Sequence, residues 1–260
     1  MKKFNAFQLK IIAVVLMVVD HVAEFAQPAL SETAYYAMRY AGRLVFPIFL
    51  FLLVESFFNT SHQGRYVQRL WIWALGMMAG SYALIRLCDS LLGRTDAFYA
   101  QGYVEFDRLF YGVGNNIFLS LACIATVLVC VTAWKNTQSK SRWRIFCTLA
   151  PLLVAFFVVE GRYPGLYMAL AFFIWHGKPV RQYFAFACVV AITALIHVGL
   201  GENMFVADGY NWMMVFALPL IMMYNGERGP HTKSAKYFFY IFYPAHLWIL
   251  YIIARVALWR

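Results

Sequence analysis

The feature that most constrains this chain is a succession of long apolar stretches joined by short connections. Segments such as LACIATVLVCVTAW at 121–134 follow one another in a sequence that is 63% hydrophobic and only 13% charged. About 20 apolar residues cross the hydrocarbon core of a bilayer, whereas a soluble domain carries about 25% charged residues. The sequence therefore predicts an all-α, polytopic integral membrane protein, with one transmembrane helical domain over residues 1–260.

About nine stretches are long enough to be expected as transmembrane helices, with a range of roughly eight to ten. The fifth, sixth and eighth stretches are short, so re-entrant segments are an alternative for them. The expected spans are 9–27, 34–58, 67–88, 112–134, 145–159, 164–176, 181–200, 211–224 and 235–258.

The distribution of charge predicts the orientation. Loops on the cytoplasmic side of a membrane are enriched in Lys and Arg. If the N-terminus is cytoplasmic, every lysine falls on the cytoplasmic side, and the opposite connections carry most of the acids, such as Glu32, Asp89, Glu202 and Asp208. We predict a cytoplasmic N-terminus and a C-terminus on the other side.

Several other classes of protein are disfavoured. The first apolar stretch contains Asp20 and His21 and has no small-residue cleavage site after it, so it predicts a retained span rather than a signal peptide. The five cysteines lie in apolar segments without metal-type spacing, so neither disulfides nor a metal site is expected. The net charge of +10 is spread over short loops instead of forming a basic stripe, which argues against nucleic acid.

Two ionisable clusters interrupt the first two apolar stretches. Asp20 and His21 lie in the first stretch, and Arg39 and Arg43 lie in the second. A charge at such depth costs at least ~2.5–3.5 kcal/mol, so it needs a partner or a polar cavity. The first and ninth helices are expected to run outward and the second inward, which brings His246 to a similar depth. We predict that these five residues share one layer of the membrane.

The arginine spacing and the histidines indicate chemistry but leave alternatives open. Arg39 and Arg43 are four residues apart on one helical face, so an anion is needed between them. Asp20, a substrate carboxylate or a developing oxyanion would serve; a purely structural ion pair with Asp20 is the alternative. His21 is a candidate general base. Asp20 and His21 diverge by about 100° on a helix, so they do not form a hydrogen-bonded pair by spacing alone, and either a kink or a third residue is needed.

The last apolar stretch carries Tyr240, Tyr243 and His246 on one face, around Pro244, which frees a backbone carbonyl. A polar site and simple aromatic packing are both open here. Asn116 at the start of the fourth stretch is expected either to cap a helix or to bind substrate. Glu55 is a weaker candidate, and His176 is expected to be solvated. The connection at 89–111 is expected to be a lid or an amphipathic loop on the headgroups.

Four blocks of sequence carry a resemblance to a known family. They are DH at 20–21, RYAGRLVFPIFLFLLVESFFNT at 39–60, YNGERG at 224–229 and KYFFYIFYPAHLWILYII at 236–253. Together they resemble the TraX family, whose namesake acetylates F-pilin. The family is also distantly similar to the transmembrane acyltransferases that acetylate sugars of surface polysaccharides.

The resemblance implies a multi-pass acetyltransferase of the bacterial cytoplasmic (inner) membrane, with acetyl-CoA as donor, no metal, and the N-terminus of a pilin-like protein as acceptor. Its implied catalytic residues are His21, Asp20, Arg43, Arg39 and His246. The nucleotide of acetyl-CoA is expected at the basic cytoplasmic face. Candidate substrate- and cofactor-binding residues are Arg65, Arg69, Arg228, Lys236, Tyr240, Tyr243 and Asn116.

Other functions remain open at this point. The acceptor can instead be a hydroxyl of a cell-envelope glycan. A small transporter would use the Asp/His/Arg cluster as a proton relay or an anion site. A third possibility is a non-catalytic partner in pilus or envelope assembly. The sequence does not distinguish acetyl from a longer acyl donor, or direct transfer from a covalent acyl-enzyme intermediate, and it leaves the oligomeric state open.

Overall fold

The protein is a bundle of helices. The computed structural model describes residues 3–93, 116–136, 139–156, 159, 161–201, 203–205, 207–230 and 232–258. In these ranges the only β-type pairing is an isolated bridge between Phe4 and Tyr224. The predicted all-α class is therefore confirmed. The elements are α1 (Ala6–Phe25), η1 (Gln27–Ala29), α2 (Glu32–Gly42), α3 (Val45–Phe58), α4 (Gln63–Leu92), α7 (Ile117–Asn136), α8 (Ser139–Ala155), α9 (Arg162–Ile174), α10 (Pro179–Gly199), η3 (Ala207–Ala217), α11 (Leu218–Met222), α12 (Lys233–Ile253) and η4 (Ala254–Leu258).

Helices occupy all nine expected spans, but not all of these helices are long. Over the described residues, six segments are long and apolar enough to cross a membrane: Ala6–Phe25, Glu32–Phe58, Gln63–Leu92, Ile117–Trp134, Pro179–Gly199 and Tyr237–Ala257. The other three are α8 with 17 residues, α9 with 13, and the apolar run Tyr210–Met222. These three correspond to the fifth, sixth and eighth expected spans, which were already short in the sequence. The polytopic membrane class is confirmed, and the orientation stays a prediction.

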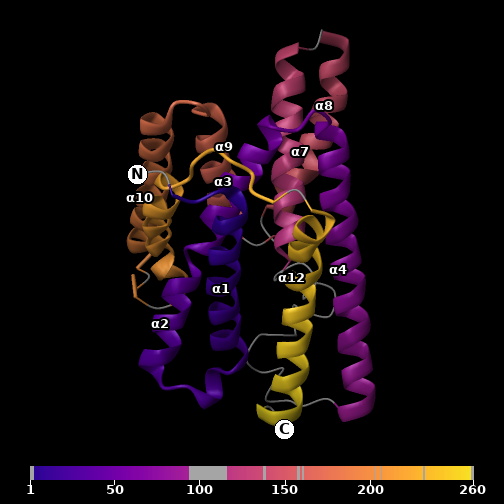
Figure 1. Cartoon of the computed structure of the whole chain (residues 1–260), viewed down its shortest axis with the longest axis vertical. Coiled ribbons are helices and arrows are strands. Elements are labelled where there is room, and N and C mark those ends of the chain that lie inside the picture. The colour runs from indigo at the N-terminus through magenta and orange to yellow at the C-terminus, as the bar shows by residue number, and fades with distance from the viewer. Residues whose placement is uncertain are drawn as a thin grey trace.

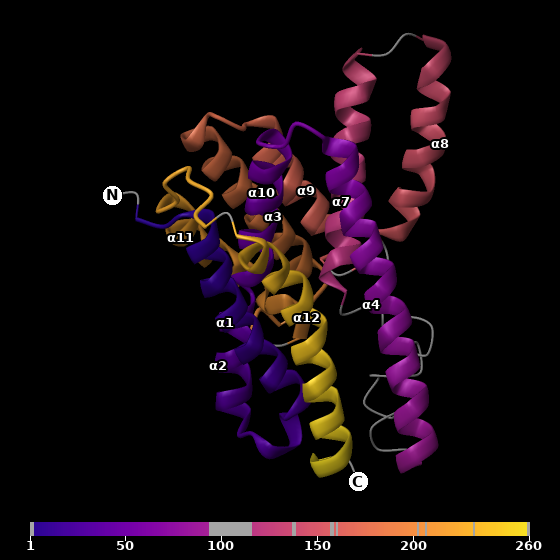
Figure 2. The same ribbon diagram turned by 45° about the vertical axis from the view of Figure 1, so that its right-hand side comes forward.

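α3 occupies the centre of the bundle. It packs against α1, α7, α9 and η3, and Figures 1 and 2 show it enclosed by these neighbours. Its sequence, VFPIFLFLLVESFF, is apolar on nearly every face, which is typical of a helix buried on all sides. α12 lies between α1 and α4 and contacts both (Figure 2). α3 thus supports the helices that carry the polar site.

The second expected span, 34–58, is two helices with a joint between them. α2 ends at Gly42, α3 begins at Val45, and Arg43 and Leu44 form a tight turn in which the Arg43 N–H donates to the Tyr40 carbonyl at 3.2 Å. Pro47 has no N–H, and its ring excludes the carbonyl four residues earlier, which is that of Arg43. The proline therefore explains why the helix breaks at Arg43.

Basic residues gather at one end of the bundle, and a buried ion pair lies at the other. The first residues of α1, α4, α10 and α12 gather at one end, which Figure 1 shows nearest the label N, and they carry Lys10, Arg69 and Arg181. At the other end, the Arg255 Nη2 lies 3.2 Å from Asp89 Oδ1 and donates to the Gly93 carbonyl at 2.7 Å. This buried ion pair ties η4, which directly follows α12, to the end of α4. The rest of the expected loop at 89–111, from residue 94 onward, lies outside the described residues.

Candidate active site

Two histidines from distant parts of the chain meet inside the bundle. His21 on α1 and His246 on α12 are 6% and 8% exposed, and His21 Nδ1 lies 2.8 Å from His246 Nε2. The second nitrogen of His246, Nδ1, lies 2.9 Å from the Phe242 carbonyl oxygen one turn earlier on α12. The third residue needed to orient His21 is therefore His246, whereas its neighbour Asp20 points elsewhere.

These contacts determine which nitrogens carry hydrogen. A carbonyl oxygen only accepts, so His246 Nδ1 must carry the hydrogen that it donates to Phe242. In a neutral ring, His246 Nε2 is then an acceptor, and His21 Nδ1 must donate to it. His21 Nε2 is left with its lone pair. The arrangement holds His21 in the tautomer that a general base requires.

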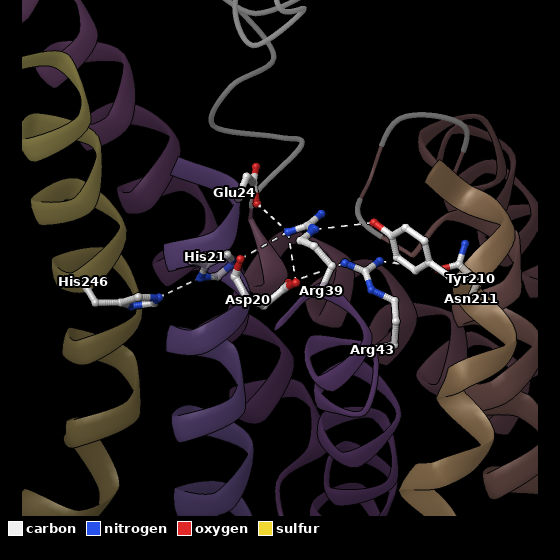
Figure 3. A network of polar contacts seen from close by, with 8 residues as sticks. All are labelled: Asp20, His21, Glu24, Arg39, Arg43, Tyr210, Asn211 and His246. Carbon is white, nitrogen blue, oxygen red and sulfur yellow. Dashed lines mark hydrogen bonds and ion pairs between the residues drawn. The ribbon is translucent and has the colours of Figure 1, made fainter. Parts of the chain in front are cut away.

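A balanced cluster of four charges lies beside the histidines (Figure 3). Asp20 Oδ1 lies 3.0 Å from Arg39 Nη1, and Asp20 Oδ2 lies 3.5 Å from Arg43 Nη2. Arg39 Nη1 also pairs with Glu24 Oε2 at 3.2 Å. Asp20 is thus the anion between the two guanidiniums, and two carboxylates neutralise two arginines. This balance reduces the cost of placing charge within the spans.

Gly42 allows this cluster to form. A Cβ atom at Gly42 would lie 2.2 Å from Asp20 Cγ, far inside van der Waals contact. Any larger residue would push the Asp20 carboxylate away from Arg39 and Arg43. The glycine in the RYAGR motif therefore lets α2 approach the acidic side chain of α1.

Three residues of the cluster were not among the sequence candidates. They are Glu24, Tyr210 and Asn211. The sequence could have indicated Glu24, because it lies four residues after Asp20 and therefore on the same face of α1. No sequence pattern indicated Tyr210 and Asn211, since they lie on η3, far from Arg39 and Arg43 in the sequence. Arg39 Nε donates to the Tyr210 hydroxyl at 3.4 Å, and Arg43 Nη1 donates to Asn211 Oδ1 at 3.4 Å.

The two arginines have different environments. Arg43 stacks on the Tyr210 ring, with Cζ 5.1 Å from its centroid. Its Nε is buried and has no hydrogen-bond partner among the described residues. Arg43 also lines a small cavity of about 40 Å³ with Asp20, His21 and Tyr243, whereas Arg39 does not line it. One water molecule needs a cavity volume of about 10–15 Å³, so this cavity can hold a group of a few heavy atoms.

A larger cavity of about 360 Å³ opens at the end of the bundle that holds the N-terminus. Its cations are Lys10, Arg69 and Arg228, and its one carboxylate is Glu55. Such a volume lies within the range of about 300–1,000 Å³ that small-molecule sites occupy. An excess of positive charge around a cavity of this size favours an anionic ligand.

The structure separates the predicted binding residues. Arg69, Arg228 and Tyr240 line the large cavity, and Arg69 Nε donates to the Tyr240 hydroxyl at 3.3 Å. Tyr243 lines the small cavity instead, and its hydroxyl accepts from the Ile117 N–H at 3.3 Å. Arg65 is exposed and lies outside both cavities. Lys236 belongs to α12, but its side chain lies outside the described part of the chain.

Asn116 takes the capping role that the sequence left open. Its Oδ1 accepts from the Leu119 N–H at 3.2 Å, and its Nδ2 donates to the Ala74 carbonyl at 2.9 Å. The side chain is fully buried and lines neither cavity. It starts α7 and attaches it to α4, away from both cavities.

His176, which was expected to be solvated, is 28% exposed and also has partners within the protein. His176 Nε2 lies 3.0 Å from Glu55 Oε1, and the Phe58 ring stacks on the imidazole with centroids 4.0 Å apart. The pair fixes the end of α9 against α3 at the edge of the large cavity. No cluster of metal-ligating side chains is found among the described residues.

The fold and the site together define a class of protein: a multi-pass helical membrane protein with a charged, histidine-containing centre inside its spans. A family model described as TraX protein matches residues 6–254, so the chain belongs to the TraX family. It is also 26% identical over 263 residues to a protein of Dichelobacter nodosus named "Probable fimbrial assembly protein FimC, serogroup H1", covering 95% of this chain and 94% of that protein. No solved structure matches.

Proposed function

We propose that this protein is an acetyltransferase of the bacterial inner membrane. It transfers an acetyl group from cytoplasmic acetyl-CoA to the N-terminal amine of a pilin-like subunit. The observation that carries the proposal is the orientation of His21: a buried imidazole with its Nε2 lone pair free, in a small cavity next to a buried guanidinium nitrogen that has no hydrogen-bond partner among the described residues.

The large cavity supports acetyl-CoA as the donor. Lys10, Arg69 and Arg228 offer three cations for phosphate groups, and guanidinium forks match phosphate oxygens well. The nearest lining residues of the two cavities are about one turn apart on α12 and about two turns apart on α1, which corresponds to ~5–10 Å. A flexible pantetheine arm can cross that distance and bring the thioester to His21.

The residues then have distinct roles in the transfer. The acceptor nitrogen attacks the thioester carbon, its proton passes to His21 Nε2, and the carbonyl oxygen becomes negatively charged. The Arg43 guanidinium, which lines the same cavity, stabilises that oxyanion. The carbonyl re-forms as the C–S bond breaks, His21 Nε2 gives its proton to the departing thiolate, and the amide product and free CoA leave. Asp20 and Arg39 hold Arg43 in place through the ion pairs of the cluster.

The family and the relative favour a protein acceptor. The relative is named for fimbrial assembly, and fimbriae are built from pilin subunits. A transfer to a glycan hydroxyl would use the same base and the same oxyanion donor, so the acceptor must be established by experiment. A transporter or a non-catalytic assembly partner would need neither acetyl-CoA nor a base.

The test uses the full-length protein in nanodiscs with radiolabelled acetyl-CoA and a peptide acceptor that has a free N-terminal amine. We expect saturable binding of acetyl-CoA and label transfer to the peptide. His21→Ala should reduce transfer by at least roughly 10²-fold, which is the usual contribution of a general base, and should leave membrane insertion and acetyl-CoA binding intact. His62→Ala, which alters an exposed histidine before α4, is the matched control.

Two outcomes would contradict the proposal. If the folded protein binds no acetyl-CoA, the enzyme assignment fails. If transfer proceeds equally well to a peptide whose N-terminus is already acetylated, the amine is not the acceptor. A glycan fragment offered in parallel distinguishes O-acetylation from N-acetylation.

A further inference from the structure

Two groups from the helical turn before His246 offset part of the cost that burial imposes on a positive charge there. The Phe242 carbonyl accepts from His246 Nδ1 at 2.9 Å, and the Phe242 ring stacks on the imidazole at 5.1 Å with an interplanar angle of 15°. A carbonyl dipole and the face of an aromatic ring both stabilise a neighbouring cation. One residue thus supplies two groups that favour the imidazolium form of His246.

The position of His21 is less favourable for a charge. Both nearby carboxylates are engaged by guanidiniums: Asp20 pairs with Arg39 and Arg43, and Glu24 pairs with Arg39. An imidazolium at His21 would be a third positive charge beside two arginines. The two carboxylates already neutralise these arginines and would leave the third charge unbalanced. Positive charge formed during the reaction is therefore better placed on His246, one ring further from the cluster.

We propose that His246 is a proton relay: it takes the His21 Nδ1 proton when His21 Nε2 removes a proton from the acceptor. This inference rests on the proposed acetyl transfer. It makes His246 a positioning residue that acts through His21 and touches neither substrate.

The step balances as follows. The acceptor N–H proton moves to His21 Nε2 while the His21 Nδ1 proton moves to His246 Nε2, across the 2.8 Å contact. His21 is then neutral with hydrogen on Nε2, and His246 is an imidazolium balanced by the oxyanion. When the C–S bond breaks, His21 Nε2–H protonates the thiolate, and His246 returns its proton to His21 Nδ1. Both rings end as they began.

His246→Gln separates a relay from a simple orienting group. The glutamine carbonyl can accept from His21 Nδ1–H much as His246 Nε2 does, but it cannot hold a second proton. We expect kcat to fall roughly 10²-fold with KM unchanged, in line with the usual contribution of a proton-transferring group. If kcat stays at the wild-type value, orientation alone is sufficient and the relay is overturned.

Rates in mixtures of H2O and D2O give a readout that a structural role would not change. For the wild type we expect a curved dependence on the deuterium fraction, because two protons move in one step. For His246→Gln we expect a linear dependence, because only one proton moves. A linear wild-type dependence would overturn the relay.

The hydrogen positions can be measured without any acetyl transfer. Histidine labelled with ¹⁵N in the nanodisc protein should show a His21 signal with hydrogen on Nδ1 and none on Nε2. Comparison with His21→Gln assigns this signal among the six histidines. The opposite tautomer would overturn the relay even if the enzyme is active. The predicted tautomer in a protein that transfers no acetyl group would instead count against the proposed function alone.

Discussion

At the scale of single residues, the site depends on how each polar side chain uses its atoms. Asp20 divides its two oxygens between Arg39 and Arg43, and His21 directs one nitrogen to His246. These adjacent residues of α1 therefore contact different groups, Asp20 the arginines and His21 the second histidine, because their side chains point about 100° apart. That divergence lets one helix hold both the counter-ion of the arginines and the candidate base.

Arg43→Lys tests the guanidinium at this scale. A lysine keeps the charge but cannot contact Asp20, Asn211 and an oxyanion together, since it lacks the planar fork. We expect kcat for acetyl transfer to fall roughly 10²–10³-fold, as happens when an oxyanion donor is lost. The measurement is steady-state transfer to the amine peptide, with Arg65→Lys, an exposed arginine, as control. Full activity in Arg43→Lys would show that charge alone is needed.

At the scale of elements, proline and glycine decide where helices break and how closely they pack. Pro47 causes the joint that places Arg43 between α2 and α3, and Gly42 lets α2 approach Asp20. Between α4 and α12, Gly80 makes room for Trp248, whose Nε1 donates to the Ser81 hydroxyl at 3.0 Å. Trp248 is two residues after His246, so this packing also sets the position of the relay.

Gly80→Ala tests that dependence. An added Cβ would lie 2.5 Å from the Trp248 ring, so the indole or α12 must move. We expect a loss of roughly 1–3 kcal/mol in the free energy of unfolding, typical of overpacking, with reduced acetyl transfer. Gly76→Ala is the matched control one turn earlier on α4, where nothing lies within 4 Å of the added atom. Equal stability of the two variants in detergent melts would contradict the packing argument.

At the scale of the whole molecule, two cavities lie along the same three helices. α1, α3 and α12 each contribute residues to the large basic cavity and to the small one beside His21. The large cavity is lined by residues from the first turns of α1, α4 and α12, which lie at the end of the bundle that holds the N-terminus (Figure 1). This arrangement suits an anionic donor that enters from one side and reacts deeper within the spans.

The double variant Arg69→Gln/Arg228→Gln tests the large cavity as the donor site. A hydrogen bond to a charged group contributes about 1.5–3 kcal/mol, so we expect KM for acetyl-CoA to rise roughly 10-fold or more with little change in kcat. Arg65→Gln is the control, because Arg65 is exposed on the same helix as Arg69 and outside the cavity. An unchanged KM in the double variant would place the donor elsewhere.

The sequence by itself predicted the membrane class, most of the helices and a shared depth for the charged residues, but not the break between α2 and α3. Apolar length and the energetic cost of buried charge are local properties, so they can be evaluated segment by segment. They predicted that Asp20, His21, Arg39, Arg43 and His246 lie in one layer. Helical spacing also showed correctly that Asp20 would not orient His21.

Only the tertiary structure decided which of these residues meet. The contact between His21 and His246 joins positions 225 residues apart, and Tyr210 and Asn211 reach the arginines from η3. Such contacts depend on how the helices pack around α3. The spacing of residues within a single segment does not predict that packing. The division of the predicted binding residues between two cavities, and the capping role of Asn116, were decided in the same way. The depth of a residue within a membrane can be predicted from its own helix. Which residue it contacts at that depth depends on how all the helices pack together.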